Sequence, residues 1–137
     1  MSGGRWQFAI QNDLRYVAWL RSFFPAAVRV ADIPLSARGC WQCTLVLVEA
    51  VNNAVLHGHR GDHSPWITMT LVLRPKRVQM TVMNPGPPFR LPPSHRVPPL
   101  EQTDGRGLYL IMEYCRRVRL RRVQRQNILE MTYVETA

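Results

Sequence analysis

The sequence has no long uninterrupted apolar run, a single lysine and only three cysteines among its 137 residues. A membrane-spanning helix needs about 20 mostly apolar residues. An export signal needs a charged segment and an apolar segment before a cleavage site of small residues. Neither pattern occurs, so we expect a cytoplasmic protein that does not enter a membrane. Cys40 and Cys43 form a C-x-x-C pair with no second pair to follow it, so we expect free thiols rather than a metal or redox centre.

Acidic residues are also scarce, because 9 of them face 18 lysines and arginines. The formal net charge is +9, which favours an acidic partner, either a protein surface or a nucleic acid. Charge alone does not choose between these two. With 46% hydrophobic residues the chain can bury a proper core, and its length predicts one domain over residues 1–137.

Residues 36–59 predict the organising helix of the chain. Ser36 is a good N-cap and Gly58 a good stop signal. The middle of this segment is apolar almost all the way round, which is typical of a buried helix.

Four polar residues interrupt this apolar helix. Glu49, Asn53 and His57 are spaced i, i+4 and i+8 and therefore lie in one stripe, with Asn52 beside it. Burying such groups unpaired costs several kcal/mol, so the stripe favours a cleft. A proton-accepting carboxylate one turn from an amide oxygen suits metal-assisted chemistry on a phosphate. The alternative is a core helix whose polar residues cap neighbouring loops.

The remaining elements follow from periodicity and turn signals. We expect a first helix that starts at Asn12 and stops at Phe24, because Pro25 follows. A hairpin turns at Pro75 and Lys76, and a second hairpin turns at Gln126 and Asn127. The expected strands cover residues 5–10, 66–74, 77–83, 116–125 and 128–134.

Residues 84–104 hold seven of the 11 prolines and predict a long loop, either a flap over a ligand or a docking segment. The loop ends in Gly105, Arg106 and Gly107, after which an apolar helix begins at Leu108. Free backbone amides at such a helix start form an anion site.

Arginines dominate residues 116–125. Val118, Leu120 and Arg122 should share one face of this strand, opposite three other arginines. One reading is a solvated edge whose charge discourages aggregation. The other is a patch for an acidic partner, and the lack of aromatic residues here disfavours nucleic acid.

The order strand, helix, helix, strand, strand, helix, strand, strand predicts an α+β fold. We expect a two-layer α/β sandwich with helices on one face of a mixed, mainly antiparallel sheet.

Three segments together resemble the GHKL (Bergerat-fold) ATPase superfamily. EAVNNAVLHGH is similar to its N box, VMNPGPPF to its adenine-binding G1 box, and DGRGLYLIME to its G2 box. The closest resemblance is to the cytoplasmic branch of anti-sigma factors that act as protein serine kinases. It spans nearly the whole chain.

This resemblance implies ATP and Mg²⁺ as cofactors and gives the matching residues roles. Glu49 would be the general base and Asn53 the Mg²⁺ ligand, and residues 87–104 would form the ATP lid. The other implied nucleotide-binding residues are Asn52, His57, Asn84, Gly86, Gly105, Arg106, Gly107 and Leu108.

Two positions depart from the family pattern. Asn84 stands where the family has the aspartate that accepts a hydrogen bond from the adenine amino group. Its oxygen can accept that bond, but its NH₂ cannot. Pro88 replaces a glycine of the same box and stiffens the start of the lid.

The implied function is an ATP-dependent protein serine kinase that phosphorylates a STAS-type anti-anti-sigma protein and holds a sigma factor. A homodimer is consistent with the family. The alternative is a non-catalytic module of the same fold that sequesters a regulatory partner with weak or no ATP binding. We do not expect direct nucleic-acid binding. No helix pair with a phospho-accepting histidine precedes the domain, which disfavours a histidine kinase.

Overall fold

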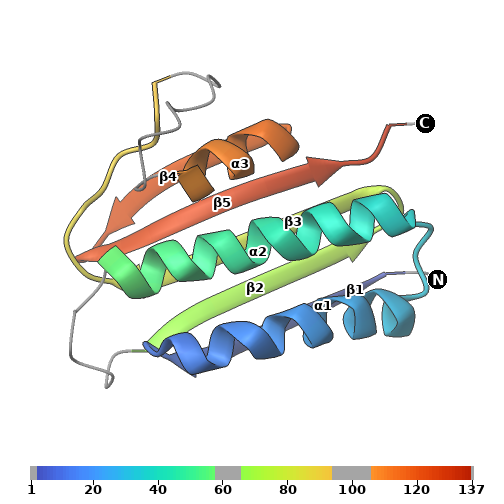
Figure 1. Cartoon of the computed structure of the whole chain (residues 1–137), viewed down its shortest axis with the longest axis horizontal. Coiled ribbons are helices and arrows are strands. Elements are labelled where there is room, and N and C mark those ends of the chain that lie inside the picture. Colours follow the sequence, from blue (N-terminus) through green and yellow to red (C-terminus); the bar gives the residue numbers. More distant parts are fainter. Residues whose placement is uncertain (1–2, 58–65, 94–105, 137) are drawn as a thin grey trace.

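The computed structural model describes residues 3–57, 66–93 and 106–136, and it folds them into two layers (Figure 1). One layer is a five-stranded sheet with the strand order β1-β2-β3-β5-β4. The strands are β1 (Gly4–Gln11), β2 (Trp66–Arg74), β3 (Arg77–Pro85), β4 (Arg117–Val123) and β5 (Gln126–Val134). Every neighbouring pair is antiparallel, so the expected α+β sandwich is confirmed, and the sheet is antiparallel rather than mixed.

The second layer contains three helices, all on one face of the sheet (Figure 1). They are α1 (Val17–Ala31), α2 (Ala37–His57) and α3 (Arg106–Tyr114). The core lies between the layers, where alternate residues of the strands meet the apolar faces of the helices. No helix of the described residues is long and apolar enough to cross a membrane.

The expected end of the first helix is wrong, because α1 continues through Pro25 to Ala31. An interior proline costs about 3 kcal/mol through its missing N–H and its ring. Phe24, Ala27 and Ala31 are buried on either side of it, so packing against the sheet and α2 outweighs this cost.

The expected start of that helix also moves. Asp13 rather than Asn12 caps the segment, because its carboxylate accepts a hydrogen bond from the Arg15 amide at 2.9 Å. This cap opens a short 3-10 turn, Leu14–Tyr16, which leads into α1.

The second hairpin turns two residues earlier than expected. Gln124 and Arg125 occupy the turn with positive φ angles of 50° and 66°, as a tight type I′ turn requires. Gln126 and Asn127 therefore begin β5. Arg122 is exposed, although its position shares a strand face with Val118 and Leu120.

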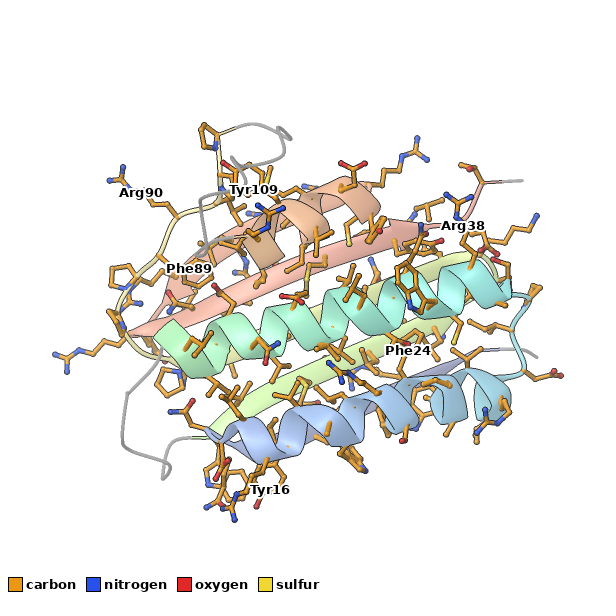
Figure 2. All side chains as sticks on the ribbon, viewed as in Figure 1. Tyr16, Phe24, Arg38, Phe89, Arg90 and Tyr109 are labelled. Atoms are coloured by element: carbon orange, nitrogen blue, oxygen red, sulfur yellow. The ribbon has the colours of Figure 1, made fainter. Side chains whose placement is uncertain are left out.

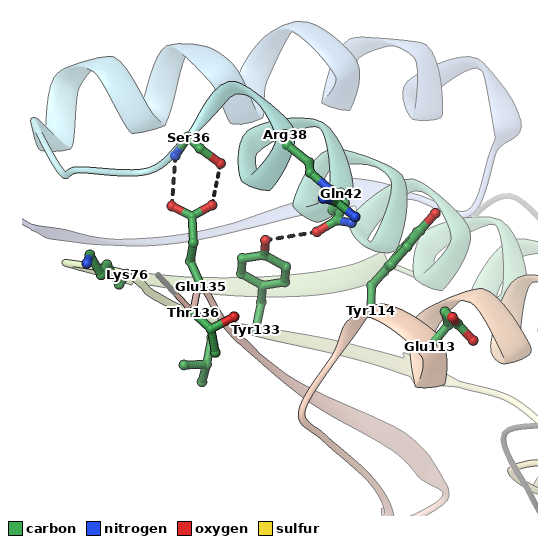
Figure 3. A pocket seen from close by; sticks show the side chains of 10 residues that line it. Ser36, Arg38, Gln42, Lys76, Glu113, Tyr114, Tyr133, Glu135 and Thr136 are labelled. Atoms are coloured by element: carbon green, nitrogen blue, oxygen red, sulfur yellow. Dashed lines mark hydrogen bonds between the residues drawn. The ribbon is translucent and has the colours of Figure 1, made fainter.

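The start of α2 is held by its own N-cap residue and by a glutamate near the C-terminus. The Ser36 hydroxyl accepts a hydrogen bond from the Gly39 amide at 2.9 Å, which confirms Ser36 as the N-cap. Glu135, just after β5, accepts hydrogen bonds from the Ser36 amide at 2.9 Å and from the Ser36 hydroxyl (Figure 3). This carboxylate also lies close to Gly39, where a side chain would collide with it.

A polar cavity of about 520 Å³ opens beside this contact (Figure 3). Two pairs of its lining residues bind each other, since the Tyr133 hydroxyl donates to Gln42 Oε1 at 2.9 Å and Glu135 binds Ser36. The cavity thus belongs to the network that fastens the C-terminal end of the sheet to the start of α2.

We predict that Glu135→Ala lowers the free energy of unfolding by about 1 kcal/mol, because the helix start loses its carboxylate acceptor. Urea denaturation measures this. Glu113→Ala is the matched control, since Glu113 lines the same cavity but is exposed on α3. Equal effects of the two substitutions would contradict the role of Glu135.

Candidate functional site

The polar stripe of α2 lies on the expected helix. Glu49, Asn52 and Asn53 are half-buried, while Ala50, Val51 and Ala54 between them are buried in the core. His57 is the last residue of α2, and its side chain lies outside the described part of the chain. The stripe therefore borders the core without entering it, as a cleft requires.

Glu49 lies directly against the start of α3. A Cβ placed on Gly107 would collide with Glu49 Oε2 and would lie 3.4 Å from Glu49 Cδ. With glycine at position 107 the carboxylate can keep this place, whereas a side chain there would displace it. The contact brings together two residues that lie 58 positions apart in the sequence.

The surroundings of Glu49 favour its protonated form. Burial raises the pKa of its carboxyl above the usual range, and the positive charge of Arg21 on α1 offsets part of this effect. A half-buried carboxylate with a raised pKa is suited to accept a proton during a reaction.

Asn84 lies near the end of β3 on the buried face, with 4% of its surface exposed. Its Nδ2 donates to the backbone carbonyl of Pro85 at 3.2 Å. The reverse orientation would set two oxygens against each other, so this contact fixes the amide. No described residue donates to Oδ1, which is left as an acceptor. Gly86 follows with a φ of 151°, a conformation that side chains rarely adopt.

Two residues that sequence reasoning missed hold the loop after β3. Asn127 is buried, and its Nδ2 donates to the carbonyl of Pro87 at 2.9 Å. Arg122 donates from Nη1 to the carbonyl of Gly86 at 2.8 Å and to Asn127 Oδ1 at 2.9 Å. With the contact of Asn84, three successive carbonyls each accept a side-chain hydrogen bond.

The strand register explains why these residues meet. Asn127 pairs with Asn84 on β3 and with Arg122 on β4, so all three stand in one row across the sheet. The sequence of one strand alone does not reveal such a row, because its members come from three strands. A correct position for the β4–β5 turn would have placed Asn127 opposite Asn84, and this was the available signal.

The remaining predicted residues belong to the start of α3. Arg106 and Gly107 open the helix and are partly exposed, and Leu108 is buried. Gly105 and residues 94–104 of the predicted lid lie outside the described residues.

The end of β3, the last turns of α2 and the start of α3 gather at the same end of the molecule (Figure 1). Figure 2 shows Phe89 and Tyr109 at this end and Arg38 at the other.

Comparison with known proteins places this arrangement in a family. The histidine kinase-like ATPase domain family matches residues 10–133, which is most of the chain. The chain belongs to the histidine kinase-like ATPase family. No curated protein is similar enough to count as a match.

Solved structures of this family share the fold of the chain. The catalytic domain of histidine kinase ThkA, in a nucleotide-free form, is 17% identical with a TM-score of 0.52, and the match covers 98% of this chain and 97% of that domain. Histidine kinase AdeS of Acinetobacter baumannii is 13% identical with a TM-score of 0.50, and the match covers 93% of this chain and 67% of the AdeS chain. At these identities the likeness concerns the fold alone.

We predict that Glu49→Gln raises the free energy of unfolding at pH 7. The folded chain holds the Glu49 proton at pH values where the unfolded chain has already lost it, so the ionised carboxylate costs stability above its folded pKa. The cost is absent below the unfolded pKa of about 4.3. The advantage of the variant should therefore shrink as pH falls toward this value. Urea denaturation across this pH range measures it, and a wild type that is the more stable at pH 7 would contradict it.

Asn127→Asp should lower the free energy of unfolding by about 1–3 kcal/mol, because the Pro87 carbonyl loses its donor and faces a buried carboxylate. The side chain keeps its size, and its contact with Arg122 becomes an ion pair that offsets part of this loss. Gln79→Glu makes the same change of group at an exposed position of β3 and serves as the control. A loss no larger than that of the control would show that Asn127 does not hold the loop.

Proposed function

We propose that this chain is an ATP-dependent protein serine kinase of the anti-sigma type, which phosphorylates a STAS-type anti-anti-sigma protein. The observation that carries the proposal is the contact between Glu49 and Gly107. It sets a carboxylate of raised pKa beside the glycine-rich helix start that the family uses for phosphates.

The residues present fit an adenine nucleotide. Asn84 offers an acceptor oxygen for the adenine amino group, because its Nδ2 donates to the Pro85 carbonyl. Gly86 carries no side chain that a flat base would meet, and its carbonyl is already held by Arg122. The loop is therefore ordered before a nucleotide arrives, which lowers the entropy cost of binding.

The roles of the other residues follow from their places. Asn53 would hold Mg²⁺ one turn along α2 from Glu49, with Asn52 and His57 beside the phosphates. Gly107 and Leu108 would offer backbone amides, and Arg106 would add positive charge. Mg²⁺, when bound, neutralises charge on the phosphates. Glu49 would take the proton of the attacking serine hydroxyl.

The partner assignment rests on the resemblance to the anti-sigma branch. In such a module the kinase binds either its phosphorylatable antagonist or a sigma factor, and phosphorylation changes which of the two is held. The net charge of +9 is consistent with acidic protein partners.

A second function, sequestration without catalysis, draws support from Asn84 and Pro88. An amide in place of the family's aspartate weakens the hydrogen bond to adenine, because a carboxylate is the stronger acceptor. Such a module would hold its partner whether or not ATP is present.

Glu49→Ala decides between the two functions. We expect transfer of the γ-phosphoryl group from Mg²⁺·ATP to a purified STAS-type protein of the same organism to fall by about 10²–10⁴-fold, as for loss of a general base. The affinity for ATP should change by less than about threefold, since the base acts in the transition state. Labelled ATP and a filter-binding assay measure both quantities.

Glu113→Ala, on the exposed side of α3, is the control and should change neither quantity. Parallel losses of rate and ATP affinity would contradict the role of Glu49 as base. If the wild type transfers no phosphoryl group, and Glu49→Ala leaves the affinity for ATP unaltered, sequestration is favoured.

A further inference from the structure

The face of the sheet opposite the helices carries a row of arginines. Arg117, Arg119 and Arg121 occupy alternate positions of β4 and therefore point to this face. Arg116 precedes them, and Arg77 stands at the start of β3. All three helices cover the other face (Figure 1), so in the described part of the chain these side chains have no layer above them.

Most of this positive charge is unpaired. Glu130 on β5 is the acidic residue among the lining residues, and it already binds Arg121, whose Nε donates to Glu130 Oε1 at 2.5 Å. Arg77, Arg116, Arg117 and Arg119 have no carboxylate partner among the described residues. They line a hollow of about 530 Å³ on the sheet surface. Guanidinium groups in such a place favour carboxylate or phosphate ligands.

The same strand is the edge of the sheet. Only β5 pairs with β4 in the described residues, so the backbone N–H and C=O groups on its other side are available to an incoming strand. The two faces of β4 carry different kinds of side chain. Val118 and Leu120 pack against the core on the inner face, opposite the arginines of the outer face.

We propose that the β4 edge binds an extended segment of a partner protein in which acidic and apolar residues alternate. In a strand added to β4, side chains on the same face would lie about 6.7 Å apart, because they alternate between faces. The arginines of β4 have the same spacing. Residues opposite Arg117, Arg119 and Arg121 would lie on the outer face, where carboxylates pair with them. The intervening residues would lie beside Val118 and Leu120, where apolar side chains extend the core.

Other occupants fit the surface less well. Single-stranded nucleic acid needs aromatic side chains on which bases stack, and the residues lining the hollow include none. A second copy of the chain would bring two identical rows of arginine together, which repel each other. The surface lies across the sheet from Glu49, so this proposal does not depend on ATP binding, and either proposal can fail without the other.

The test is fluorescence anisotropy of the whole chain, without nucleotide, with a labelled nine-residue peptide of alternating glutamate and valine. A peptide of the same composition with its glutamates in one block is the first control. We expect the alternating peptide to bind more tightly. The pair of substitutions Arg117→Gln and Arg119→Gln should weaken it by about tenfold, with less effect at high salt. Arg29→Gln, on the exposed side of α1, should leave binding unchanged.

A peptide with N-methyl groups on its strand-pairing amides separates edge pairing from simple charge attraction, and we expect it to lose binding. Equal binding of the alternating, block and N-methylated peptides would overturn the proposal. So would variants of Arg117 and Arg119 that bind like the wild type, or tighter binding of a 12-nucleotide single-stranded DNA than of the alternating peptide.

Discussion

The close approach of α2 and α3 at Glu49 and Gly107 is the constraint on which the site depends. A side chain at position 107 would push the Glu49 carboxylate away from its present place. Burial raises the pKa of this carboxyl, so an ionised Glu49 costs stability. Neither helix alone defines the site, because one supplies the carboxylate and the other supplies the room for it.

A second constraint acts at the end of the sheet. Pro85 ends β3 and Pro87 and Pro88 follow it, and none of these three residues has a backbone N–H to donate. Asn84, Asn127 and Arg122 supply donors to three successive carbonyls, so a segment with few backbone hydrogen bonds of its own still has a defined shape. The row that holds the loop belongs to the sheet, which is rigid, and not to the segments that follow.

The sequence predicted the elements with strong local signals. The Ser36 cap, the apolar periodicity of α2 and the alternation of β2 and β3 are properties of single segments, and the structure confirms them. The helix end predicted at Pro25 is wrong, because the penalty of a helix-interior proline is a local property. The burial of Phe24 and Ala27 that outweighs this penalty depends on the sheet and α2. The clamp of Asn127 and Arg122 needed strand register across β3, β5 and β4, and an error of two residues in one turn hid it.

Calorimetric titration of the purified chain with ATP, in the presence and absence of Mg²⁺, tests the central claim most directly. If Asn84, Gly86 and the start of α3 form one nucleotide site served by Asn53, binding should be measurable in the micromolar range and should weaken when Mg²⁺ is removed. Absence of binding at millimolar ATP, from a chain that unfolds cooperatively, would contradict the account and leave a fold that works by holding partners alone.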